Sequence, residues 1–369
     1  MAPPPARIPL VDLRAQYEAI KDEVNKAITG IIEASSFILG EPVSKFEEEF
    51  AKYCGKEHCV GTSNGTSALI LALKAAGIGK GDEVITTPTT FIATAEAITL
   101  SGAAIKFADA DYRTCNMSAE KLKSAITDKT KAVIPVHLYG HPCDMDAIRE
   151  IAEKKGIMII EDCAQAHGAE YKGQKVPATG TGCFSFYPAK ILGAYGDAGA
   201  IVTNDDKIAE KARLLSNHGR RKGEKHVSEL EGSNERLDAI QAAILSVKLK
   251  HLDKWLEARR KKAARYTKEL SNVETPYEES YAKPGYYMYV IRTERRDDML
   301  SYLNQKGIGA QIHYPVPVHL QQAYKSKGWG PGSYPETERA ANKVLSIPLY
   351  PELTEEQQGA VIKAINEFR

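Results

Sequence analysis

The 369-residue sequence lacks several features that define other classes of protein. No apolar run approaches the roughly 18 residues that a membrane-spanning helix needs. The opening residues 1–7 lack the apolar core of a signal peptide. The net charge is only +1, so no global field attracts nucleic acid or an anionic membrane. We therefore expect a cytoplasmic protein without a nucleic-acid or membrane partner.

Metal and nucleotide motifs are missing as well. The six cysteines are scattered and do not form the paired sets of a zinc site or a disulfide framework. We therefore predict reduced thiols and no metal. Neither the Gly-Lys-Ser/Thr of a P-loop nor the Gly-x-Gly-x-x-Gly of a dinucleotide site occurs, and no His-Glu-x-x-His helix of a zinc protease is present.

Short β-rich runs alternate with helical patterns between residues 60 and 205. The expected strands span 83–87, 104–107, 132–136, 157–161, 183–186 and 200–203, and the expected helices span 66–76, 91–101, 118–126, 144–154 and 207–216. This alternation predicts an α/β fold with a mostly parallel central sheet and helices on both faces. Ligands of such sheets bind beyond the carboxyl ends of the strands.

The pattern changes after residue 235. One long helix is expected from about residue 235 to 270, because apolar residues recur on one face. Strands are expected over 286–291 and 308–313, a helix over 296–305, and a last helix after the capping box Thr354–Gln357. We therefore predict a large domain over residues 1–245 with an N-terminal helical segment, and a small α+β domain over residues 246–369.

Lys190 is the lone charge in the apolar or small segment 184–193. Burial disfavours the ammonium form of a lysine, which leaves a better nucleophile that can form a Schiff base with a carbonyl group. The alternative is a lysine whose stem is buried at a strand end while its amine reaches water.

Asp162 and the turn at 61–69 supply two further groups. Asp162 ends a buried-type strand, where a carboxylate can face the ring nitrogen of a cofactor, whereas Glu161 points to the other side by strand alternation. The turn is small and polar and leads directly into a helix, whose N-terminus suits a phosphate. An Asp that caps a turn and an ordinary capped helix start are the alternatives. Together with Lys190, these groups are the anchors that pyridoxal 5′-phosphate (PLP) requires.

The sequence resembles the DegT/DnrJ/EryC1/StrS family of nucleotide-sugar aminotransferases over nearly its whole length. The matching segments span residues 8–13, 37–40, 64–69, 161–168, 185–197, 234–238 and 313–320. The resemblance implies a PLP fold-type I, aspartate-aminotransferase-like homodimer with shared active sites and a smaller C-terminal domain. It also implies transfer of an amino group from L-glutamate to a nucleotide-linked keto sugar.

The resemblance assigns roles to individual residues. Lys190 matches the lysine that holds PLP as a Schiff base and then carries a proton, and Asp162 matches the partner of the pyridinium nitrogen. Gln165 matches a residue near the ring hydroxyl, and Phe91 matches the aromatic that stacks on the ring. Phosphate contacts are implied for Gly65, Thr66 and Ser185, and for Asn234 of the neighbouring subunit.

Substrate contacts are less specific. They are predicted for Tyr187, Arg236, His313, Tyr314 and His319, and packing in the small domain is the alternative for the last three. Two positions depart from the family pattern. Ala189-Lys190-Ile191 replaces a Thr-Lys-Asn or Ser-Lys sequence, which removes a local polar contact. Glu235 adds a carboxylate, and the sequence does not define its role.

The segment 311–319 is common among members that aminate C3 of a dTDP- or UDP-linked 3-keto sugar, and we expect that reaction. Amination at C4 of a 4-keto-6-deoxy sugar nucleotide uses the same cofactor anchors and is an alternative. A non-catalytic PLP-binding regulatory protein is a third interpretation.

Overall fold

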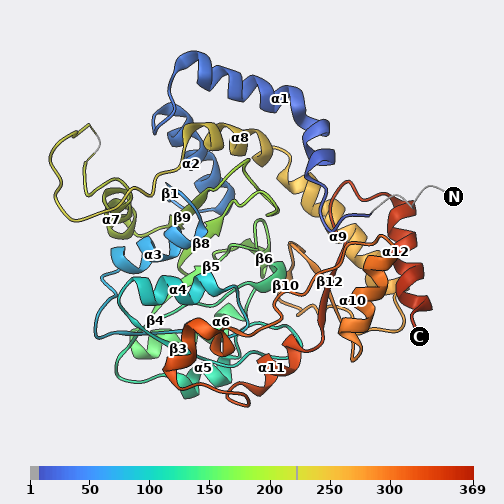
Figure 1. Cartoon of the computed structure of the whole chain (residues 1–369). Helices are drawn as coiled ribbons and strands as arrows, with labels where there is room; N and C mark the ends of the chain where they lie inside the picture. Colours follow the sequence, from blue (N-terminus) through green and yellow to red (C-terminus); the bar gives the residue numbers. More distant parts are fainter. Residues whose placement is uncertain (1–7, 222) are drawn as a thin grey trace.

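The computed structural model describes residues 8–221 and 223–369, so the expectation about a signal peptide, which rests on residues 1–7, lies outside the described residues. Its larger part is built on a seven-stranded sheet with the order β1-β9-β8-β5-β4-β2-β3 (Figure 1). These strands are β1 (His58–Thr62), β2 (Glu83–Thr86), β3 (Ala104–Phe107), β4 (Thr130–Val133), β5 (Met158–Asp162), β8 (Thr181–Ser185) and β9 (Gly199–Thr203). β9 runs antiparallel to its neighbours β1 and β8, whereas β8, β5, β4, β2 and β3 run parallel.

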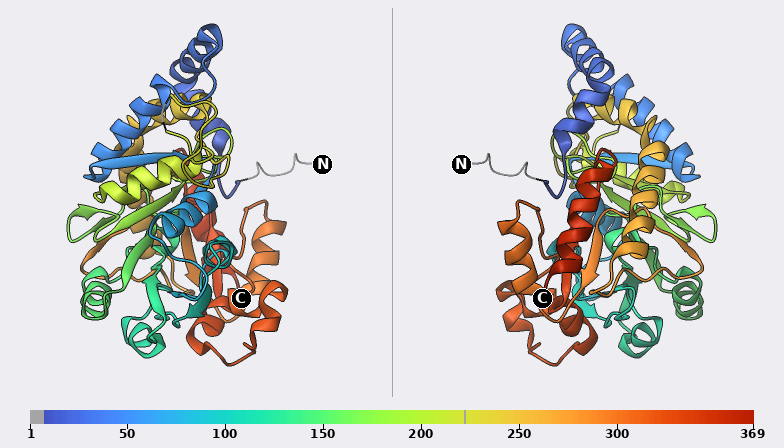
Figure 2. Two further views of the ribbon diagram at one scale, coloured as in Figure 1. Left: turned by 90° about the vertical axis from the view of Figure 1, so that its left-hand side faces the viewer. Right: turned by 90° about the vertical axis from the view of Figure 1, so that its right-hand side faces the viewer.

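Helices cover both faces of this sheet, as Figures 1 and 2 show. One face packs against α2 (Glu41–Cys54) and α8 (Ala239–Leu249), and the other packs against α3 (Gly65–Ala75), α4 (Ile92–Leu100) and α7 (Asp206–Ser216). Neighbouring residues of a strand point to opposite faces of the sheet. Phe184 packs in the core on the α2 and α8 side, and Cys183 packs in the core on the α3, α4 and α7 side. The long α1 (Leu13–Ala34) lies along α8, and α5 (Ala119–Ala125) and α6 (Met145–Lys155) cover the β3–β4–β5 side.

The α/β fold with a mostly parallel sheet is confirmed, and the ends of the strands and helices expected between residues 66 and 216 lie within three residues of their predicted positions. The prediction of a single helix over 235–270 is wrong. The segment contains two helices, α8 and α9 (Leu252–Glu269), which are separated at Lys250 and His251. Residues 234–238 are extended because they form isolated bridges with Asn217, Thr62 and Ile38.

The C-terminal part has its own small sheet, in which β11 (Tyr289–Arg292) pairs antiparallel with β12 (Val344–Ile347). The helices α10 (Arg296–Gln305), α11 (Pro335–Ala341) and α12 (Glu355–Glu367) belong to this part, and the predicted capping box opens α12. The strand expected over 308–313 is wrong, because Ile308 pairs with Ile8 and Gln311 with Ser346, so no continuous ladder forms.

Short elements complete the chain. A three-stranded sheet has the order β10-β6-β7, formed by β10 (Ala282–Lys283), β6 (Glu170–Tyr171) and β7 (Gln174–Lys175). The 3₁₀ helices are η1 (Leu138–Gly140), η2 (Val318–Leu320) and η3 (Gln322–Lys327). The predicted domain boundary at residue 245 falls inside α8, and the C-terminal core includes α9 only from Ala263 onward. No helix of the described residues has the length and apolar character to cross a membrane.

Candidate active site

The predicted anchors gather at one edge of the large sheet. β5 ends at Asp162 and β8 ends at Ser185, so both side chains lie at the carboxyl ends of neighbouring parallel strands. Lys190 follows β8 in a turn closed by its own N–H, which donates to the Tyr187 carbonyl at 2.8 Å. Helix α3 begins beside them, because Gly65 packs against Ser185. This edge is where ligands bind in sheets of this kind.

Asp162 is buried, and its carboxylate has few partners. Thr94 Oγ1 donates to Oδ2 at 2.8 Å, and the N–H of Ala164 donates to Oδ1 at 3.1 Å. Burial raises the pKa of Asp162, and these two hydrogen bonds and the charge of Lys190 oppose that rise. A cation placed against a buried carboxylate of this kind stabilises its ionised form. The site therefore suits a protonated ring nitrogen.

Lys190 carries an amine suited to nucleophilic attack. Its Nζ lies 4.4 Å from the centroid of the Tyr287 ring, and no carboxylate of the described residues forms an ion pair with it. Burial lowers the pKa of Lys190 to about 8, although the Asp162 carboxylate acts in the opposite direction. A larger fraction of the amine is therefore neutral near pH 7 than in an exposed lysine.

The start of α3 forms a cradle for an anion. Asn64 caps the helix, and its Oδ1 accepts from the N–H of Ser67 at 2.8 Å. The N–H groups of Gly65 and Thr66 open the helix, where they have no intrahelical acceptor. A Cβ on residue 65 would come within 2.6 Å of the Cβ of Ser185, so only glycine allows this approach. The backbone N–H groups of Gly65 and Thr66 thus offer a site suited to a phosphate.

Glu235 binds the back of the same turn. Its carboxylate accepts hydrogen bonds from the Ser63 hydroxyl and, at 2.5 Å, from the Ser67 hydroxyl. The backbone joins in, because the N–H of Ser63 donates to the Glu235 carbonyl at 3.0 Å. Gly61–Gly65 has the Gly-x-Ser-x-Gly spacing of a hydrolase nucleophile, but the Ser63 hydroxyl donates to a carboxylate rather than to a histidine. Glu235 therefore fixes the turn, a role that the sequence had left open.

One wall of the site is formed by Gln165, Tyr314, Phe91 and His313. Gln165 accepts from the N–H of Tyr139 at 2.7 Å and donates to the Tyr314 hydroxyl at 3.1 Å. The Tyr314 and Phe91 ring centroids are 5.7 Å apart, and Phe91 remains 54% exposed. Burial, aided by the charge of Lys190, lowers the pKa of His313 to about 4, so this ring is neutral at pH 7.

Four predicted residues stand apart from this group. Tyr187 is 55% exposed at the mouth of the Lys190 turn. Asn234 is exposed, and Arg236 donates to Asn217 at 3.3 Å and lines a separate surface cavity of about 990 Å³ beside α2 and α7. His319 is 1% exposed and shares a 3.0 Å hydrogen bond with Glu338, which favours packing over substrate contact.

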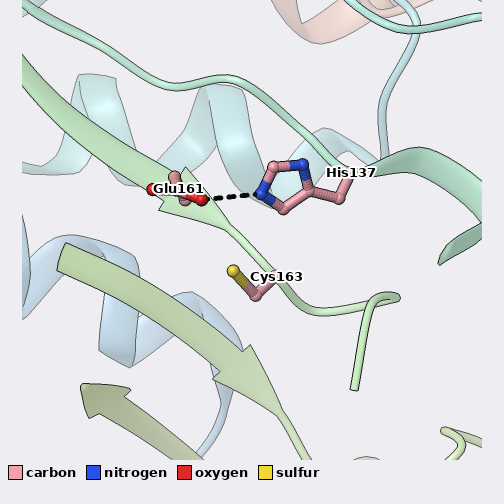
Figure 3. A group of neighbouring side chains, drawn as sticks. All are labelled: His137, Glu161 and Cys163. Atoms are coloured by element: carbon pink, nitrogen blue, oxygen red, sulfur yellow. Dashed lines mark hydrogen bonds and ion pairs between the residues drawn. The ribbon is translucent and has the colours of Figure 1, made fainter. Parts of the chain in front are cut away.

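His137 and Glu161 form a buried pair that the sequence did not reveal (Figure 3). The Nε2 atom of His137 is 3.0 Å from Glu161, which points away from the site as strand alternation predicts. The N–H of Cys143 donates to Nδ1 of His137 at 3.0 Å, so Nδ1 carries no proton and Nε2–H donates to Glu161. The backbone N–H of His137 also donates to the Asp162 carbonyl at 3.1 Å, which steadies the end of β5.

The same geometry bears on metal binding. His137, Glu161 and Cys163 place possible ligand atoms within 4.8 Å of one another. Both ring nitrogens of His137 are already engaged in hydrogen bonds, and Glu161 accepts from the N–H groups of Ala178 and Thr179 at 2.8 Å each. A metal would have to displace these bonds. The cluster is satisfied as a buried hydrogen-bond network.

The sheet order, with a lysine, a buried aspartate and a helix N-terminus meeting at its carboxyl edge, defines the fold-type I class of PLP-dependent enzymes. The chain belongs to the DegT/DnrJ/EryC1/StrS aminotransferase family, whose model matches residues 18–366. It is accordingly an aminotransferase that acts on nucleotide sugars.

Similar proteins match the chain from end to end. A "pleiotropic regulatory protein" of Geobacillus stearothermophilus is 47% identical over 98% of this chain and 98% of its own. A dTDP-3-amino-3,4,6-trideoxy-alpha-D-glucose transaminase of Streptomyces venezuelae is 43% identical over 98% of this chain and 96% of its own. The crystal structure of S. venezuelae DesV with a ketimine intermediate has a TM-score of 0.96 and 42% identity, and covers 99% of this chain and 98% of that chain.

Proposed function

We propose that this protein uses PLP to transfer an amino group from L-glutamate to C3 of a dTDP- or UDP-linked 3-keto sugar. The observation that carries the reaction type is the meeting of Lys190, Asp162 and the α3 turn at one sheet edge. Support for C3 comes from the S. venezuelae relative, whose name specifies a 3-amino sugar and which aligns over nearly the full length of both chains.

The residues present fit this cofactor. Lys190 would hold it covalently, Asp162 would face its ring nitrogen, and the α3 turn with Ser185 would hold its phosphate. Phe91 would stack on the ring, and Gln165 would lie near the ring hydroxyl group. Bound PLP supplies an electron-withdrawing ring that stabilises negative charge on the carbon next to the reacting amino group.

The chain then contributes proton transfer and orientation. Lys190 would act as a general base once its amine is free, because its low pKa suits proton transfer near neutral pH. Asp162 would keep the ring nitrogen charged from a buried position, where an electrostatic contact is stronger than in water. The neutral imidazole of His313 offers the substrate a hydrogen-bonding group without adding charge.

The reaction is tested by turnover with defined sugars. The purified protein with PLP and L-glutamate is expected to convert a dTDP-linked 3-keto-6-deoxy sugar into its 3-amino product, followed by mass spectrometry and by release of 2-oxoglutarate. A UDP-linked 4-keto-6-deoxy sugar serves as the comparison. Turnover of the 4-keto sugar alone would assign the protein to C4 amination instead.

The G. stearothermophilus relative is named a pleiotropic regulatory protein, and this name favours regulation as a second candidate function. L-Glutamate separates the two without any sugar. Added to the yellow protein it bleaches the visible band if the first half of the transfer occurs. An unchanged band with PLP bound would support the regulatory function.

We further propose a homodimer in which Asn234 reaches the phosphate of the neighbouring subunit. Asn234 is exposed, although the adjoining Glu235 is tied to the α3 turn of its own chain. A heterodimer of one Lys190→Ala and one Asn234→Ala subunit then keeps one complete site. We expect about half of the native dimer's activity, at a PLP concentration that saturates the native protein but not the Asn234→Ala homodimer. Differently tagged, co-expressed subunits allow this measurement, and activity no higher than in either homodimer would show that Asn234 acts within its own chain.

A further inference from the structure

Helix α8 binds the backbone of the segment that follows Lys190. Gln241 Oε1 accepts from the N–H of Tyr195 at 2.8 Å. Lys248 Nζ donates to the Gly193 carbonyl at 2.7 Å. The two side chains stand seven residues apart on α8, which places them two turns apart on the same face. One face of this helix therefore fixes the segment at two points.

Lys248 is unusual because it is completely buried, with 0% of its surface exposed. Its amine lies 4.2 Å from the centroid of the Tyr195 ring. Burial lowers its pKa to about 7, and the charge of Glu352 opposes that change. Lysine is rarely buried without a carboxylate partner, because desolvation of the amine costs free energy. The hydrogen bond to Gly193 survives loss of the charge, since a neutral amine still donates.

The Gly193 carbonyl is connected to the Lys190 turn through close backbone contacts. The N–H of Ala194 donates to the Phe186 carbonyl at 2.8 Å, which closes the segment 186–194 into a loop. A Cβ on residue 193 would come within 2.3 Å of the Pro188 carbonyl oxygen. Gly193 thus rests directly on the residues that precede Lys190, and a displacement of its carbonyl would displace the turn.

We propose that Lys248 is a positioning residue for Lys190, which it serves by holding the Gly193 carbonyl on α8. Gln241 is the second anchor of the same loop. The inference deepens the proposed function, on which its catalytic consequence rests. The anchoring of the loop is a property of the chain alone and is open to measurement without the cofactor.

The test compares Lys248→Met, which keeps most of the apolar stem but loses the donor, with Lys250→Met, an exposed lysine at the end of the same helix. In the cofactor-free protein we expect amide hydrogen exchange at residues 193–196 to become about tenfold faster in Lys248→Met only. In the loaded enzyme we expect kcat for the glutamate half-reaction to fall about tenfold, with KM changed less than twofold. Lys248→Gln, which retains a donor, should recover part of both losses.

Unchanged exchange in Lys248→Met would overturn the proposal. Faster exchange with native kcat would also overturn it, because the loop would then be anchored without consequence for Lys190. If Lys248→Met does not fold, Gln241→Ala removes the other anchor at a partly buried position and is judged by the same two readouts. If the protein turns over no keto sugar, the exchange result still decides the anchoring, so the two proposals fail separately.

Discussion

Replacing Lys190 with alanine is expected to abolish the visible absorption band of the PLP-loaded protein and to lower the rate of amino transfer by about 10²–10⁴-fold or more. The variant loses both the covalent attachment of the cofactor and the base that moves the proton. Absorption spectra after incubation with PLP and removal of the excess measure the first loss, and the rate of 2-oxoglutarate formation measures the second. Lys74→Ala, an exposed lysine on α3, is the matched control.

The pH dependence of cofactor capture gives an independent readout of the same residue. Only the neutral amine attacks the aldehyde of PLP, and the pKa of Lys190 is lowered to about 8. Capture by the cofactor-free protein should therefore accelerate with rising pH and level off above about 8. A visible band that persists in Lys190→Ala would show that another amine holds the cofactor.

The second large effect is expected for Asp162→Asn, which should lower kcat by about 10²–10³-fold while the cofactor stays attached to Lys190. The amide cannot keep the ring nitrogen protonated, so the ring withdraws electrons less strongly. The substitution suits the local hydrogen bonds, because the Thr94 hydroxyl can accept from the new NH₂ group and the N–H of Ala164 still finds an oxygen. Single-turnover kinetics with glutamate separate this loss from weaker binding.

In the cofactor-free protein, Asp162→Asn should increase the stability of the fold, although it lowers kcat in the loaded enzyme. Burial raises the pKa of Asp162 in the folded protein. The ionised carboxylate therefore destabilises the fold once the pH rises above the pKa that Asp162 has in the unfolded chain. This penalty is absent at low pH, where both states are protonated. Cofactor-free Asp162→Asn should therefore resist urea better than the native protein at pH 8 but not at pH 3. A native kcat in Asp162→Asn would contradict the assigned role. So would a cofactor-free variant whose stability equals that of the native protein at both pH 8 and pH 3.

Much of this architecture follows from local sequence patterns. The six strands predicted between residues 60 and 205 and the opposite directions of Glu161 and Asp162 come from chain periodicity, which needs no distant partner. The start of α3 was found because a small polar turn leads into an apolar helix. The resemblance to a known family then supplied roles that no local pattern contains.

The features that were not predicted depend on contacts between distant residues. Glu235 meets Ser67 from 168 residues away, and Lys248 meets the Gly193 carbonyl from 55 residues away. β1 was not predicted because Gly61 interrupts it and Val60 and Thr62 are its only β-branched residues, so it lacks a continuous β-rich run. Apolar periodicity continues across the break at Lys250, so the pattern could not distinguish one helix from two.

The closed loop around Lys190 limits how that residue can move. Its backbone is fixed by the turn to Tyr187, by the bond between Ala194 and Phe186, and by α8 beneath Gly193. The amine nevertheless has to bond with the cofactor at rest and travel to a proton during turnover. All of this travel must come from rotation about the four-carbon stem of a single side chain. The amine of Lys190 therefore changes position through its side-chain torsion angles, while the backbone of the loop stays in place.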